Sequence, residues 1–255
     1  MMITKLTAKI LAVCAFASVV SAHQAGAAMI VFQNGLNGYT GTQDAYISSA
    51  ASQREKNYGT ADRLILRAGS VPKNILVSFD INSLPDDLCI DSATLSLYKL
   101  RTTPDPIGSV YKILSGPWSE GNGGNATAGD VDWNHRIHGG TAWNTPGLGA
   151  NTDYELPASD SENLTVNGWY SWDISSIFQD WYNGIDPNYG LVLKATGNND
   201  TLEFASSEYG YCYKRPKLII NYHQGCGIVP EPASLSLLGF SLLGLAKIRR
   251  FRKVN

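Results

Sequence analysis

The stretch NILVSFDI, residues 74–81, decides the fold. Its apolar residues Ile75, Val77, Phe79 and Ile81 fall at every second position. Successive side chains of a β-strand point to opposite faces of a sheet, so this period of two predicts a strand with one face buried and the other toward solvent. The segment therefore predicts a sheet that covers a core on one side.

The same alternation recurs along the chain, and Gly, Pro, Asn and Asp separate the segments at turn positions. The further strand candidates are DAYISSA (44–50), DRLILRAG (62–69), SATLSLYKL (92–100), GSVYKIL (108–114), GLVLKA (190–195), TLEFASS (201–207) and PKLIINY (216–222). So many short strands predict an all-β chain, built as a single β-sandwich.

One segment has the period of a helix instead. In DISSIFQDWYNG, residues 173–184, apolar residues recur at i, i+3, i+4 and i+7, Asp173 is placed to cap the start, and Gly184 to end it. The apolar positions are Ile174, Ile177, Phe178 and Trp181. We expect one short helix laid across the sandwich.

The first 28 residues have the composition of an export signal. Lys5 and Lys9 precede an apolar run over residues 10–20, and small residues follow it. Signal peptidase requires small side chains one and three residues before the cut. Residues 1–28 are therefore predicted to form a signal peptide whose apolar part is helical.

The last 27 residues, 229–255, have the features of a second sorting signal. The motif Val229-Pro230-Glu231-Pro232 precedes an apolar run over 233–246, which covers only about two thirds of a ~30 Å hydrocarbon core. Basic residues, Arg249 and Arg250 among them, follow this short predicted transmembrane helix and keep its end cytoplasmic. This order resembles the PEP-CTERM sorting signal, which implies cleavage by exosortase, transient membrane anchoring and delivery to the surface of a Gram-negative bacterium that makes exopolysaccharide.

Residues 29–228 remain between the two signals, enough for one domain with a substantial core. The whole chain has a net charge of −2, whereas this body carries 13 basic and 21 acidic side chains, a net charge of −8. Such an acidic body argues against nucleic acid as a partner.

Several motifs in a fixed order resemble a DNRLRE-type domain over residues 44–222. They are AYISSAASQREKNYGTADRLILRAG, KNILVSFDINSLPDDLCIDSATLSLYKL, PWSEG, VDWN, WDISSIFQDWYNGIDPNYGLVLKA and FASSEYGYCYKRPKLIINY. The resemblance implies a jelly-roll β-sandwich grouped with carbohydrate-binding modules, some of which bind alginate-type acidic polysaccharides. Two features depart from the family. Many relatives are attached to an enzyme, whereas this sequence shows no enzyme domain beside the predicted sandwich, and Asp132 replaces the Thr that usually precedes the Trp of VDWN.

A basic cluster is the first candidate site. Arg63 and Arg67 share one face of their predicted strand, and Lys73 opens the next strand. An Arg guanidinium matches a carboxylate with two hydrogen bonds, so a stripe of this kind suits a polyuronate. The alternative is a solvated outer face, where such residues keep an acidic protein soluble.

Tryptophan is the second candidate, because sugar rings stack on flat aromatic faces. All six Trp lie between residues 118 and 181. Trp118 and Trp181 are expected in the core, whereas Trp133, Trp169 and especially Trp143, in the Gly-rich segment TAWNTPGLG, are candidates for a sugar platform. Packing is the alternative for each of them.

A metal loop is the third candidate, with Ca²⁺ as the one cofactor that the residues suggest. Asp130, Asp132 and Asn134 alternate as at the start of a calcium loop, although the rest of the EF-hand pattern is missing. His135 and His138 are three residues apart, but the sequence offers no third zinc ligand near them.

Three cysteines lie outside the signal peptide, which leaves one thiol over if a disulfide forms. Cys212 and Cys226 flank a predicted strand that would hold them about 20 Å apart, too far to bridge. Cys89 opens another strand and would meet Cys226 if the two strands are antiparallel neighbours. We therefore predict a Cys89–Cys226 disulfide.

No nucleophile elbow or HExxH motif is present, and Glu120, Asp153, Glu155 and Glu208 cannot be placed together by sequence alone. We predict a non-catalytic protein exported to the cell surface or extracellular matrix, which binds polysaccharide, with acidic exopolysaccharide as the expected ligand. Signal peptidase and exosortase are its expected processing partners. The alternatives are a structural surface or biofilm protein that associates with other proteins, and a polysaccharide-degrading enzyme.

Overall fold

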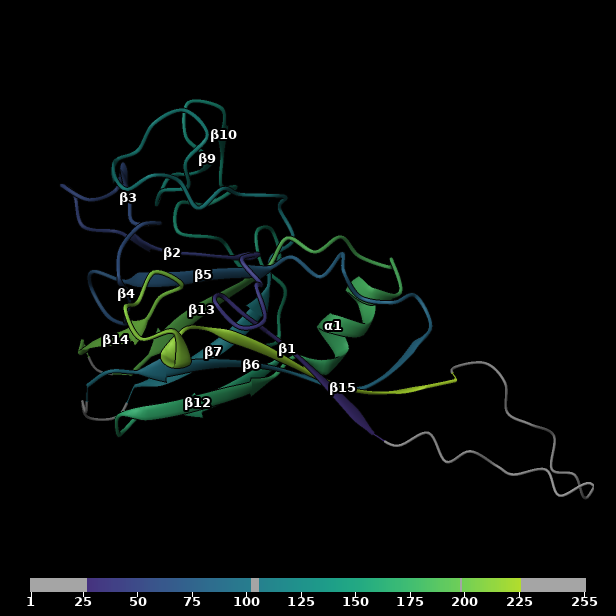
Figure 1. Ribbon diagram of the computed structural model, residues 1–255. Coiled ribbons are helices and arrows are strands. Elements are labelled where there is room, and N and C mark those ends of the chain that lie inside the picture. Colours follow the sequence, from purple (N-terminus) through teal and green to yellow (C-terminus); the bar gives the residue numbers. More distant parts are fainter. Residues whose placement is uncertain (1–26, 102–105, 198, 226–255) are drawn as a thin grey trace, which may run out of the picture.

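A computed structural model describes residues 27–101, 106–197 and 199–225. Nearly all of its regular elements are strands (Figure 1). They are β1 (Ala28–Gln33), β2 (Thr42–Ser48), β3 (Lys56–Asn57), β4 (Arg63–Arg67), β5 (Lys73–Phe79), β6 (Leu88–Lys99), β7 (Ile107–Lys112), β8 (Gly124–Asn125), β9 (His135–Ile137), β10 (Thr141–Ala142), β11 (Asp160–Asn163), β12 (Gly168–Asp173), β13 (Leu191–Thr196), β14 (Thr201–Ala205) and β15 (Lys217–Gln224), with helix α1 (Ser175–Tyr182) and the 3-10 turn η1 (Cys212–Lys214). The predicted all-β class is confirmed.

One large antiparallel sheet folds over its own core. Strands β1, β15, β6, β14 and β4 follow one another in one half, with β12 also paired to β6. The other half contains β5, β13, β7 and β11, with β2 also paired to β5. The halves join where Arg67 of β4 lies opposite Lys73 of β5. Side chains from both halves, among them Leu95 of β6 and Val77 of β5, form the main core between them.

A second core corrects the prediction of one solvent-facing side for β5. Ile75 and Val77 face the main core as expected, but Leu76 on the other side is also fully buried. The long loops that carry β3, β9 and β10 lie over β2 and β5 (Figure 1). Their tryptophans and leucine pack on this outer face, and the apolar strand residues are therefore buried on both sides.

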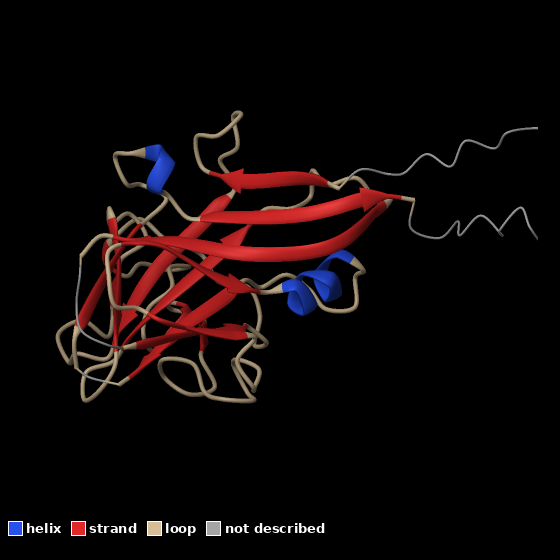
Figure 2. Cartoon of the chain, turned by 90° about the horizontal axis from the view of Figure 1, so that it is seen from below, coloured by secondary structure: helices blue, strands red, loops and turns tan. Residues whose placement is uncertain are grey.

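Helix α1 follows the predicted pattern. Ile177, Phe178 and Trp181 are buried in the main core, and Gly184 ends the segment with a φ of 66°. The N-cap residue is Ile174 in place of Asp173, whose carboxylate nevertheless accepts a hydrogen bond from the Ser175 backbone N–H at 2.8 Å. Figure 2 shows α1 and η1 at opposite ends of the strand layer.

The predicted signal-peptide helix and the short C-terminal transmembrane helix fall outside the described residues. Within the part of the chain that the structure describes, no helix has the length and apolar character to cross a membrane. Strand β1 starts at Ala28, the last residue of the predicted signal peptide, and pairs with β15 so that Ala28 lies opposite Tyr222. The two ends of the described chain therefore lie at the same end of two neighbouring strands.

Candidate functional site

The predicted basic stripe is only partly assembled. Arg67 and Lys73 lie opposite each other across β4 and β5, and burial together with the Arg67 charge lowers the pKa of Lys73. Arg63, at the other end of β4, donates to Glu203 at 2.6 Å, and Arg101 also contacts that carboxylate at 3.2 Å. The structure thus brings two of the three residues together and neutralises the third.

The predicted metal loop holds itself together with its own carboxylates. Asp130 accepts hydrogen bonds from the backbone and hydroxyl of Thr127. Asp132 is fully buried and accepts from the imidazole Nδ1 atoms of His135 at 3.1 Å and of His138 at 2.6 Å. Asp132 is therefore the third potential ligand that the sequence pattern did not reveal beside the two histidines. Because donors already occupy both of its oxygens, the geometry is that of an Asp–His network.

Trp143 is not available as a sugar platform. Its side chain is 3% exposed, packs in the second core, and donates its indole N–H to the backbone oxygen of Asp132 at 3.0 Å. Trp133 is buried in the same cluster, whereas Trp169 is 37% exposed. The loops that carry the first two tryptophans are folded onto β2 and β5, and their rings serve as core.

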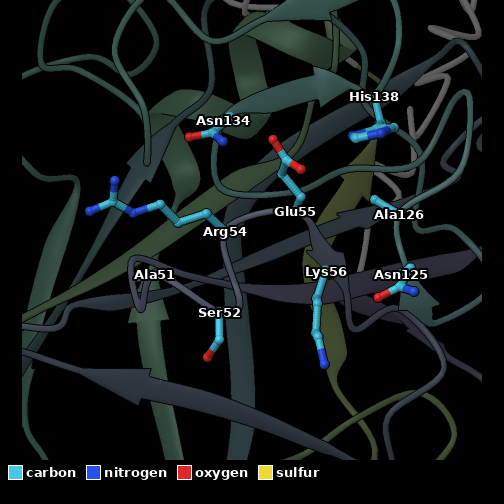
Figure 3. Close-up of a pocket in the computed structure, with 9 residues that line it drawn as sticks. All are labelled: Ala51, Ser52, Arg54, Glu55, Lys56, Asn125, Ala126, Asn134 and His138. Atoms are coloured by element: carbon cyan, nitrogen blue, oxygen red, sulfur yellow. The ribbon is translucent and has the colours of Figure 1, made fainter.

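A polar depression of about 460 Å³ opens on these loops (Figure 3). Arg54, Glu55 and Lys56 line it together with Asn134 and His138, and the three charged side chains extend in different directions. Among the described residues that line it, the His138 imidazole is the one aromatic ring. The depression therefore lacks a flat platform for a sugar ring.

A group of aromatic and basic side chains, of which Trp169, Tyr211 and Tyr213 are exposed and the others half-buried, lies elsewhere on the outer face of β6, β12 and β15. We call it the aromatic–lysine surface, and its members are Tyr98, Trp169, Tyr211, Tyr213, Lys214 and Lys217.

Strand register brings the sheet part of this surface together. Trp169 of β12 lies opposite Tyr98 of β6, and their rings meet edge to face at 5.5 Å. Lys217 of β15 lies opposite Ser96, two residues from Tyr98 and therefore on the same face. The alternate residues of β6, Leu95 and Leu97, point into the main core.

The loop before β15 supplies the rest of the surface. Arg215 fixes this loop because its Nε donates to the Tyr209 backbone oxygen at 2.9 Å and its Nη1 to that of Asn34 at 3.3 Å. The backbone oxygen of Arg215 in turn accepts from Gln33 at 2.7 Å. Tyr211 and Tyr213 remain 59% and 62% exposed beside these anchors.

Two ammonium groups lie among the exposed rings. The Lys217 Nζ is 4.0 Å from the centre of the Trp169 ring, and burial lowers the pKa of Lys217. The Lys214 Nζ is 4.6 Å from the ring of Tyr98 and 5.8 Å from the rings of Tyr211 and Tyr213. Aromatic faces can pack against the C–H groups of a sugar while the ammonium groups attract its carboxylates.

Three carboxylates also converge, at a place that the sequence did not indicate. Asp44, Glu120 and Glu208 offer oxygens within 4.8 Å of one another. They come from β2, from the loop after β7 and from the segment after β14, so their sequence separation hides the cluster. The Glu208 carboxylate accepts a hydrogen bond from the Ser207 hydroxyl at 2.7 Å. The nearby Arg215 guanidinium donates to backbone oxygens, as described above.

Comparison with known families gives two matches. The model of carbohydrate-binding module family 96 matches residues 37–222, and that of the PEP-CTERM protein-sorting motif matches residues 229–253. No curated protein matches the chain. The first match supports carbohydrate binding, and the second supports export and sorting to the cell surface of a Gram-negative bacterium. The predicted sorting residues Val229, Pro230, Glu231, Pro232, Arg249 and Arg250 lie outside the described residues and inside the matched motif.

Proposed function

The chain belongs to carbohydrate-binding module family 96, and we propose that it is a non-catalytic surface protein that binds acidic polysaccharide through the aromatic–lysine surface. The observation that carries this proposal is the position of Lys214 and Lys217 beside the exposed rings of Tyr211, Tyr213 and Trp169. A neutral sugar would need only the rings. The two ammonium groups favour a polymer that carries carboxylates.

The positive charge of Lys214 and Lys217 contrasts with the acidic character of the rest of the body. With a net charge of −8, the body repels polyanions at long range. A polyanion must therefore meet a basic region, and here the lysine ammonium groups coincide with the exposed rings. Cation–π and exposed ion-pair contacts contribute only about 0.5–1 kcal/mol each, so one domain would bind weakly. Many copies on one polymer would add avidity.

The position of the surface suits a protein held at its C-terminal end. Lys217 is the first residue of β15 and Gln224 the last, so the surface lies roughly 23 Å from the point where the C-terminal segment leaves. We propose that signal peptidase removes the N-terminal segment, and that the C-terminal one anchors the protein transiently until exosortase cuts it. The aromatic–lysine surface would meanwhile extend toward exopolysaccharide or a biofilm matrix.

Affinity electrophoresis tests the proposal. Purified residues 29–228 run through gels that contain alginate should be retarded, and gels that contain neutral dextran should have no such effect. The double variant Lys214→Ala/Lys217→Ala and the variant Trp169→Ala should migrate freely. Lys56→Ala, which removes an exposed lysine elsewhere, should keep the retardation.

Three results would contradict the proposal. Retardation that survives the Lys214/Lys217 substitutions and is lost in Arg67→Ala/Lys73→Ala would place binding at the predicted basic stripe. Release of new reducing ends from the same polymers would indicate an enzyme, for which the three converging carboxylates would be the first residues to test. An absence of retardation by any acidic polymer would favour a structural protein.

A further inference from the structure

The carboxylates of Asp44, Glu120 and Glu208 bring together β2, the loop after β7 and the segment after β14. Asp44 lies on β2, which among the described strands pairs with β5 on one edge and has no strand on the other. The backbone N–H of Asp44 donates across that edge to the Glu120 carboxylate at 2.9 Å. The Ser207 backbone N–H donates to Asp44 Oδ2 at 2.8 Å and places Glu208 beside it. Three distant segments are thus joined at one point.

One oxygen of this cluster has no protein partner. Asp44 is completely buried, and its Oδ1 has no hydrogen-bond donor within the described residues. Native proteins rarely leave a buried polar atom without a partner, because the lost hydration is not replaced. This oxygen is therefore free to contact a ligand, and the other two residues of the group also offer carboxylate oxygens to it.

The cluster has no counter-charge of its own. Within the described residues, none of the ion pairs formed by Lys, Arg or His includes Asp44, Glu120 or Glu208. Burial, and then the charge of Glu208, raise the pKa of Asp44 well above its usual range. Burial, with a contribution from Glu208, likewise raises the pKa of Glu120 to about 7. A cation between the carboxylates would remove this electrostatic conflict.

The loop that carries Glu120 is held rigidly. Asn57 is 1% exposed, and its side-chain N–H groups donate to the backbone oxygens of Glu120 at 2.6 Å and Val131 at 2.9 Å. Its side-chain oxygen accepts from the backbone of Gly59 at 3.1 Å and Gly123 at 2.8 Å. Glu120 is therefore presented by a preformed loop.

We propose that Asp44, Glu120 and Glu208 bind one Ca²⁺ ion, with Asp44 Oδ1 as the central ligand. Ca²⁺ takes six to eight oxygen ligands in flexible geometry, whereas Mg²⁺ demands a near-ideal octahedron and retains several waters. A ligand set made only of carboxylate oxygens, with waters completing it, suits the larger ion. The ion ties the open edge of β2 to the loop after β7 and to the segment after β14. It is independent of the proposed polysaccharide binding and differs from the predicted loop at Asp130 and Asp132.

Calorimetric titration of the exported protein, purified with its C-terminal segment in detergent and stripped with EDTA, tests this site. Addition of CaCl₂ at pH 7.5 should show one bound ion per chain and raise the midpoint of thermal unfolding by a few degrees. Glu208→Gln, on the exposed side of the cluster, should weaken Ca²⁺ binding roughly tenfold or more. Asp44→Asn should abolish it. The exposed control Asp87→Asn should bind like the wild type.

Glu208→Gln keeps the test decisive if Asp44→Asn fails to fold. Equal Ca²⁺ binding by the wild type and Glu208→Gln would overturn the site, as would equal affinity for Mg²⁺. A thermal unfolding midpoint that does not change with Ca²⁺ or EDTA would also overturn the site. It would indicate that the carboxylates share a proton in place of an ion. Loss of polysaccharide retardation has no bearing on these outcomes, so the two proposals can fail separately.

Discussion

Lys194 on β13 shows how the fold constrains a single charge. Its ammonium donates to the backbone oxygens of Gly147 at 2.8 Å and Leu148 at 2.9 Å, and it lies 4.8 Å from the ring centre of Tyr154. Burial lowers the pKa of Lys194 to about 8, although the charge of Asp153 opposes this shift. The charged form is therefore less favourable in the folded chain than in the unfolded chain.

This shift predicts a rise in stability with pH. Between about pH 8 and pH 10 the unfolded chain keeps the Lys194 proton while the folded chain releases it, so the free energy of unfolding increases. From pH 7 to pH 9.5 the expected gain is about 2 kcal/mol. Urea unfolding of the wild type and of Lys194→Met at both pH values measures it. The gain should vanish in Lys194→Met and persist in Lys56→Met. Identical pH profiles for the wild type and Lys194→Met would contradict the prediction.

Residue identity alone did not determine which candidate side chains face solvent. The sequence favoured Trp143 over Trp169 as a platform because of its Gly-rich segment, but the aromatic ring that a sugar needs also suits a core. The structure buries the first under Gly-rich loops and exposes the second beside Lys217. The alternation along β6 did place Tyr98 on the face of the strand away from Leu97. Only the register with β12 and β15 reveals which side chains are its neighbours.

Contacts between loops act at the scale of elements, and at Gly59 such a contact is made with the backbone of another loop. A Cβ on Gly59 would lie 2.0 Å from the backbone oxygen of Glu120, and backbone atoms cannot move aside as a flexible side chain can. Gly59→Ala should therefore lower the free energy of unfolding by about 1–3 kcal/mol. Gly210→Ala is the matched control, because nothing lies within 4 Å of its Cβ. Equal unfolding curves for the two variants would show that the loops can separate freely.

Strands and the helix were predictable because their apolar residues repeat with the period of the element. NILVSFDI and SATLSLYKL became β5 and β6, and the i, i+3, i+4, i+7 pattern became α1. The outer covering of β5 was not predictable, since residues 118–154 have no regular period and their fold depends on contacts such as those of Asn57. The carboxylate cluster could not be predicted for the same reason, because only tertiary contacts bring its members together.

At the scale of the whole molecule, the lysine ammonium groups of the aromatic–lysine surface predict a salt dependence, because their attraction for a polyanion must outweigh the repulsion by the acidic body. Between about 20 mM and 500 mM NaCl the affinity for an acidic polysaccharide should fall roughly tenfold, because added salt screens exposed charges. Titration of residues 29–228 with a uronic acid oligosaccharide across this range measures the fall. A constant affinity would indicate recognition by the aromatic rings alone.

The cysteines predict a single covalent link in the exported protein. Cys89 takes part in a disulfide, Cys212 is free and exposed, and Cys89 lies opposite His223 on the neighbouring antiparallel strand β15. The predicted partner, Cys226, lies outside the described residues, and the pairing stays a prediction. Alkylation without reduction, followed by mass spectrometry, should label Cys212 alone and recover a peptide that joins residues 89 and 226. Labelling of Cys226 would refute this pairing.

The most direct measurement of the central claim is a crystal structure of residues 29–228 with a bound hexauronate. The account predicts sugar rings packed against Trp169, Tyr211 and Tyr213, with carboxylates within hydrogen-bond distance of the Lys214 and Lys217 ammonium groups. Sugar bound in the depression beside His138 or along Arg67 and Lys73, with the aromatic–lysine surface empty, would contradict it.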